Sequence, residues 1–140
     1  MNQASSQPRP FVALAFVLIH VVISTIHGRA HQGAMVTLTT FGYIYVTVVI
    51  TLAPLVAVAL LFTRKKKIGA LLFAVSMSGS FLFGFWYHFL SETSDNVVHV
   101  SGPWHSVFLW TAIALAIIEL AATLVGLRLF QAAAKSRTNA

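Results

Sequence analysis

Hydrophobic residues form four long runs along this 140-residue chain, separated by short polar segments. The runs cover Phe11–Ile26, Thr40–Phe62, Ile68–Leu90 and Trp104–Phe130. A helix needs about 20 predominantly apolar residues to cross the hydrocarbon layer of a bilayer, with a range of about 17 to 25. The pattern therefore predicts an all-α integral membrane protein. We expect a single-domain, four-transmembrane-helix bundle with approximate spans 10–27, 40–62, 68–90 and 104–130.

Polar positions within the first run follow a helical period. His20, Ser24, His27 and His31 are separated by four, three and four residues, which places them on one face of a helix. A face that contacts lipid has no use for imidazoles, and polar groups at membrane depth usually mark function. This stripe is expected to face protein, water or a ligand.

Composition and charge agree with a membrane setting and predict its orientation. Hydrophobic residues make up 58% of the chain and charged residues only 9%, against about 25% charged in soluble domains. In a four-span layout Arg29 lies alone on one side, and the other side carries Arg9, Arg64, Lys65, Lys66, Lys67, Arg128, Lys135 and Arg137. The positive-inside rule then predicts a multi-pass protein of the plasma (inner) membrane with both termini cytoplasmic.

The same charge distribution indicates which partners to expect. A net charge of +6 is explained by topology and by contact between the basic run and anionic lipid headgroups, so no nucleic-acid partner is expected. Small residues along the third and fourth runs favour close helix packing in lipid. We expect the bilayer as the main contact, together with a homo-oligomer or other membrane subunits.

The first run also has features of a cleavable signal segment. Arg9 would precede the apolar stretch, and Gly28-Arg29-Ala30 has the small-x-small pattern of a cleavage site. Cleavage after Ala30 is therefore an alternative, although the apolar stretch is long for a signal and contains His20. An uncleaved first helix is the favoured interpretation.

Five of the six histidines fall at the predicted outer ends of the helices: His27, His31, His88, His99 and His105. Neutral imidazole is a good ligand for copper and zinc. The four-residue spacing of His27 and His31 can place two imidazoles over one ion, and the lack of cysteine excludes thiolate ligands. These five residues are the candidate ligands of a transition metal; the alternative is that they only solvate helix ends.

Two ionisable residues are predicted deeper in the membrane. His20 could ligate haem b with His88 as the partner on another helix, or could bond to a hydroxyl of a neighbouring helix. Glu119, the only acid inside a span, lies about 22 Å below Trp104 and is a candidate for proton coupling or a neutral packing residue. The depths predict a vertical gap of about 12 Å between His20 and Glu119, too large for contact.

Three functions are compatible with these features. The first is metal or haem binding in metal handling or electron transfer through the histidine cluster. The second is a non-catalytic accessory subunit of a larger membrane complex. The third is a small proton-coupled transporter that uses Glu119. Nucleophile motifs and phosphate loops are absent from the sequence, and the outer loops are short, so catalysis by this chain alone is not expected.

Overall fold

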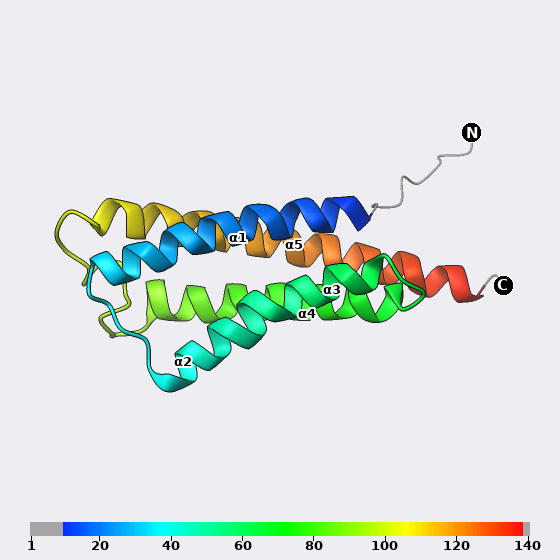
Figure 1. The fold of residues 1–140 in the computed structure, drawn as a ribbon, viewed down its shortest axis with the longest axis horizontal. Helices are drawn as coiled ribbons and strands as arrows, with labels where there is room; N and C mark the ends of the chain where they lie inside the picture. Colours follow the sequence, from blue (N-terminus) through cyan, green and yellow to red (C-terminus); the bar gives the residue numbers. More distant parts are fainter. Residues whose placement is uncertain (1–9, 139–140) are drawn as a thin grey trace.

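A computed structural model describes residues 10–138 of the chain as helices joined by short loops, with no strand in that range. Four helical rods are long and apolar enough to cross a membrane: Pro10–Gly33, Thr40–Leu61, Lys66–Leu90 and His105–Lys135. The expected all-helical architecture with four apolar helices is thus confirmed (Figure 1). These rods suit a multi-pass membrane protein.

The first rod is helix α1, Pro10–Gly33, which extends past the apolar run. It ends in a reversal where the N–H of Val36 donates to the carbonyl of His31 at 3.0 Å and the N–H of Met35 donates to Gln32 at 3.2 Å. This is the Schellman arrangement, and Met35 adopts the left-handed conformation it requires, with φ 56°. The histidine stripe from His20 to His31 therefore lies entirely on one continuous helix. Ala30, between the last two histidines, is buried as well.

The second rod consists of α2 (Thr40–Tyr45), the π-helix η1 (Val46–Leu52) and α3 (Ala53–Leu61). Thr39 caps its start, since its hydroxyl accepts from the N–H of Gly42 at 3.1 Å. Pro54 follows η1 and has no N–H to donate. The backbone accommodates this by shifting to the wider i→i−5 pattern, and Ala53 donates to the carbonyl of Val48.

The third rod is α4 (Lys66–Phe85) followed by the π-helix η2 (Trp86–Leu90), and the fourth is α5 (His105–Thr138). Helices α4 and α5 form the most extensive helix pair. They approach closely at Gly126, where an added Cβ would stand only 2.8 Å from the Cα of Ala74. Close approach through small residues is how helices gain packing in lipid.

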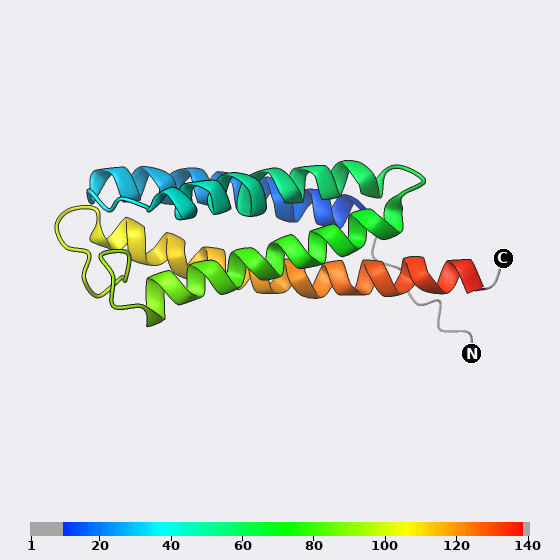
Figure 2. The same cartoon turned by 90° about the horizontal axis from the view of Figure 1, so that it is seen from below.

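The half of the bundle that holds the basic run 64–67 is solidly packed. Helix α1 lies beside α5 and α3, while α4 lies beside α5, α3 and η1 (Figures 1 and 2). Side chains from all four rods meet in one apolar core: Ala13, Val17, Ala57, Val58, Leu61, Ala70, Phe73, Met77, Ala122 and Leu129. A smaller core at the other end is built from Ala30, Val36, Val97, Val100, Phe108 and Ala112. The polar residues of interest lie between these two cores.

The fold gathers most basic residues at one end. The turn between α3 and α4, with its run 64–67, lies at the same end as the start of α1 and the end of α5 (Figure 1). The loops that follow α1 and η2 lie at the opposite end, near Arg29. Arg9 lies outside the described residues. The charge asymmetry is thus present in three dimensions, and the side of the membrane that each end faces stays a prediction.

Candidate metal centre

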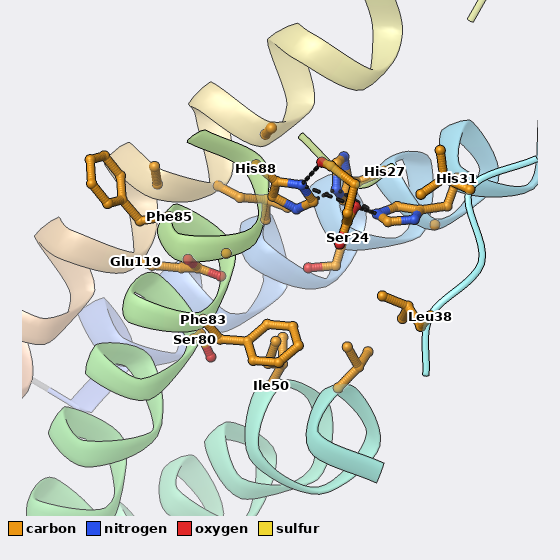
Figure 3. Close-up of a pocket in the computed structure, with 18 of the residues that line it drawn as sticks. Ser24, His27, His31, Leu38, Ile50, Ser80, Phe83, Phe85, His88 and Glu119 are labelled. Atoms are coloured by element: carbon orange, nitrogen blue, oxygen red, sulfur yellow. Dashed lines mark hydrogen bonds and ion pairs between the residues drawn. The ribbon is translucent and has the colours of Figure 1, made fainter. Parts of the chain in front are cut away.

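Three histidines meet at the end of the bundle opposite the basic run 64–67. His27 and His31 come from the last two turns of α1, and His88 comes from η2. The Nε2 atom of His27 lies 3.1 Å from Nε2 of His88 and 3.2 Å from Nε2 of His31. One ligand atom from each of the three residues lies within 4.8 Å of the others (Figure 3). We call this group the histidine triad.

The tautomer of His27 follows from its partner on α5. Its Nδ1 lies 2.8 Å from Oγ1 of Thr111. The single hydroxyl hydrogen of Thr111 is directed to helix carbonyls, that of Val107 at 2.6 Å and that of Phe108 at 3.1 Å. A hydroxyl that donates to either carbonyl accepts from His27, and in that arrangement Nδ1 of His27 carries the proton. Nε2 of neutral His27 presents a lone pair to the triad.

The same argument applies to His88. Its Nδ1 lies 3.0 Å from the backbone carbonyl oxygen of Asp95. A carbonyl can only accept, so Nδ1–H of His88 donates and Nε2 is left with a lone pair. A histidine that binds a metal through one ring nitrogen usually donates a hydrogen bond from the other, to a carbonyl or hydroxyl for example. This bond fixes both the tautomer and the orientation of the ring.

A cation would account for the convergence of all three nitrogens. Two neutral imidazoles that present lone pairs at 3.1 Å repel each other unless a positive charge lies between them. A shared proton could join only two nitrogens, whereas a metal ion satisfies all three. Zinc–nitrogen bonds of about 2.0–2.1 Å in a tetrahedron place two ligand nitrogens about 3.3 Å apart. The observed separations of 3.1 and 3.2 Å are close to that value.

Asp95 supplies negative charge beside the triad. Its Oδ1 lies 3.2 Å from Nδ1 of His88 and 3.4 Å from Nε2 of His31. This oxygen is buried and accepts no hydrogen bond, and Nδ1 of His31 is buried without a partner as well. A buried carboxylate is costly unless a positive charge compensates it, and an ion held by three neutral imidazoles would do so. Asp95 was not among the candidate ligands chosen from the sequence.

The other two candidate ligands do not belong to the triad. His99 is exposed in the loop after η2, where its Nδ1 bonds to the carbonyl of Thr93 at 2.8 Å and its Nε2 lies 3.6 Å from Glu92. His105 begins α5 and is half-buried. Among the described residues, the group able to hold an ion consists of His27, His31 and His88.

The expected gap between His20 and Glu119 is wrong. Their side chains are in contact, with Nε2 of His20 3.0 Å from Oε1 of Glu119, and both residues are buried. The error came from taking the outer end of the first helix at His27, whereas α1 continues to Gly33. His20 is therefore about 20 Å from its helix end and Glu119 about 21 Å from the start of α5, at a rise of 1.5 Å per residue. His20 and His88 thus have different partners and do not face each other as an axial pair.

A cavity of about 250 Å³ connects the triad with Glu119. Its walls are mainly apolar, with Leu38, Ile50, Phe83 and Leu115 among the lining residues. In Figure 3 the triad lies at one end of this space and Glu119 borders it farther along, near Ser80. Three protein ligands would leave a fourth coordination position on the side of the cavity, which all three histidines line together with Asp95. Sites of this type exchange ligands, while closed sites with four protein ligands are structural.

The chain matches no family model, and no curated protein or solved structure shows significant similarity to it. Arguments about function therefore rest on the geometry of the site.

Proposed function

We propose that this chain is a membrane protein that binds one divalent transition-metal ion, copper or zinc, through the Nε2 atoms of His27, His31 and His88. The supporting observation is the pair of Nε2 atoms 3.1 Å apart on His27 and His88, whose Nδ1 atoms both have other partners. The buried, unpaired Oδ1 of Asp95 adds the negative charge that such an ion requires.

The proposed role is metal handling or electron transfer at the outer face of the plasma membrane. The separation of Arg29 from the basic run at 64–67 supports cytoplasmic termini and an outward-facing triad. A bare ion fits the site better than haem, because His20 bonds to Glu119 and His88 turns its Nε2 toward His27. Association with partner subunits and proton-coupled transport through Glu119 stay alternatives. Cleavage after Ala30 would separate His27 from His31 and is incompatible with this proposal.

Elemental analysis of purified protein tests the proposal. The chain carries a tag without histidine, is loaded with zinc or copper, and is freed of loose metal by gel filtration. We expect close to one ion per chain, falling below a tenth of that in His27→Ala and in His88→Ala because each removes one of three ligands. His99→Ala and His105→Ala are the matched controls and should keep full occupancy.

Helical circular dichroism and gel-filtration profiles show whether each variant is folded. Equal metal content in folded His27→Ala and His99→Ala would contradict the proposed site, as would wild-type protein that retains no metal.

A further inference from the structure

Two cavities in the half of the bundle that holds the triad adjoin each other. The first is the cavity of about 250 Å³ below the triad, and the second, of about 170 Å³, lies between α1 and η1 beside His20. Both are lined by Ser24, Val46 and Ile50. Taken together as one hollow, the two cavities extend from the triad to the gap between the first two rods.

The opening arises from the way the second rod packs. Its inner part, α3, lies against α1, whereas η1 packs on α4. In Figure 1, α2 (cyan) diverges from α1 toward the end that holds the triad. Val21 on α1, which lines the second cavity, is an exposed apolar residue within a span. The hollow thus opens sideways into the hydrocarbon layer, at the depth where lipid-soluble molecules move.

Two of the polar groups that line the hollow are suited to hold oxygen atoms of a ligand. One is the triad, with its open coordination position. The other is Oε2 of Glu119, since Oε1 is held by His20. Oε2 of Glu119 and Cδ2 of His88 both lie within 4.0 Å of the point where a Cβ on Gly84 would stand. The carboxylate oxygen and the His88 ring are therefore no more than about 8 Å apart, so a single small ring can reach both.

The volume limits the size of an occupant. An apolar cavity of about 150 Å³ binds benzene, so 250 Å³ holds a body of about ten non-hydrogen atoms. Resting on the metal centre proposed above, we infer that the hollow binds a lipid-soluble quinol, a six-membered ring with an oxygen at each end. One oxygen takes the open position on the metal, the other bonds to Glu119, and the alkyl tail leaves between α1 and η1.

The test uses protein loaded with Co²⁺, whose visible d–d bands report a change of ligand. A hydroquinone with a ten-carbon alkyl tail is added without oxygen to the protein in detergent. We expect a saturable change in the bands. The dimethyl ether of the same compound keeps the ring and the tail but can neither coordinate well nor donate to Glu119, and it should leave the bands unchanged.

Variants locate the route of entry. Ile50→Trp places a large side chain where the two cavities join and should raise the apparent Kd of the quinol at least tenfold, with the cobalt bands of the free protein intact. Val48→Trp, an exposed position on the same π-helix, is the matched control and should bind like wild type. Ser24→Leu narrows the same passage from α1, and should weaken binding even if Ile50→Trp fails to fold.

Each outcome decides the inference. Bands that do not respond to the quinol, or that respond equally to its dimethyl ether, overturn it. An equal effect of tryptophan at positions 50 and 48 overturns the proposed entry between α1 and η1. Protein that shows no cobalt bands at all overturns the metal centre and this inference with it, so the two failures are distinguishable.

Discussion

Thr111 offers the sharpest test of how the triad is held, because it touches His27 without being a ligand itself. Its hydroxyl accepts from Nδ1–H of His27 at 2.8 Å while donating to its own helix. Thr111→Val keeps the shape of the side chain and removes the acceptor. His27 then loses the group that fixes its tautomer, so its Nε2 lone pair is no longer held toward the other two nitrogens.

The size of the effect follows from what such partners contribute elsewhere. Loss of a hydrogen bond that supports a metal-ligating histidine typically weakens metal affinity about 10- to 100-fold, which corresponds to about 1.4–2.8 kcal/mol. We expect a Kd for zinc raised by that factor with the stoichiometry unchanged at one ion. Competition against a chromophoric chelator at constant pH measures it.

Thr123→Val is the matched control. Thr123 lies on the same helix and makes the same kind of bond, from its hydroxyl to the carbonyl of Glu119 at 2.8 Å, but has no contact with the triad. Zinc affinity in this variant should equal that of wild type. If Thr111→Val also binds zinc like wild type, or if both valine variants weaken binding equally, the assignment of the His27 tautomer is refuted.

Two further outcomes are expected. Protons compete with the metal ion for the imidazole nitrogens, so the affinity for zinc falls as pH falls. The apparent Kd for zinc should rise at least tenfold from pH 7.5 to 5.0 and recover when the pH is returned to 7.5. Unchanged binding at pH 5.0 would argue against imidazole ligands. Gly126→Ala should destabilise the bundle by about 1–3 kcal/mol, because the new methyl group is forced against the backbone of Ala74. Thermal unfolding in detergent measures the loss of stability. The control is Gly28→Ala, where no atom lies within 4 Å of an added Cβ. Equal melting temperatures in the two variants would contradict the close packing of α4 on α5.

The helical rods could be predicted because each depends on local hydrophobicity. The end of α1 could not be predicted, because it depends on Met35 adopting a left-handed conformation that favours glycine. The nearby glycine, Gly33, would be the expected end signal, but it lies inside the helix. That difference of about one and a half turns changed the predicted depth of His20 and concealed its contact with Glu119. The π-helix before Pro54 was likewise not predicted, because the sequence indicates only that a hydrogen bond is lost there.

The candidate site could be predicted in part, where it depends on the geometry of a single helix. His27 and His31 are one turn apart on a single helix, so their proximity follows from helical geometry alone. Whether His88, His99 or His105 would join them depends on the path of the loop after η2. In that loop the amide of Asn96 donates to the carbonyl of Ser91 at 2.8 Å, and the fold buries Asp95 and leaves His99 outside. Such a path results from tertiary contacts, which no local pattern specifies.

The distribution of the triad along the chain has a consequence for biosynthesis. His27 and His88 are 61 positions apart, and ribosomes add about 5–20 residues per second, so roughly 3–12 s pass between the synthesis of the first ligands and the last. During that interval the first helix carries only two of the three imidazoles. The complete site forms after the third rod has joined the first, so capture of a metal ion would report that the nascent bundle has assembled.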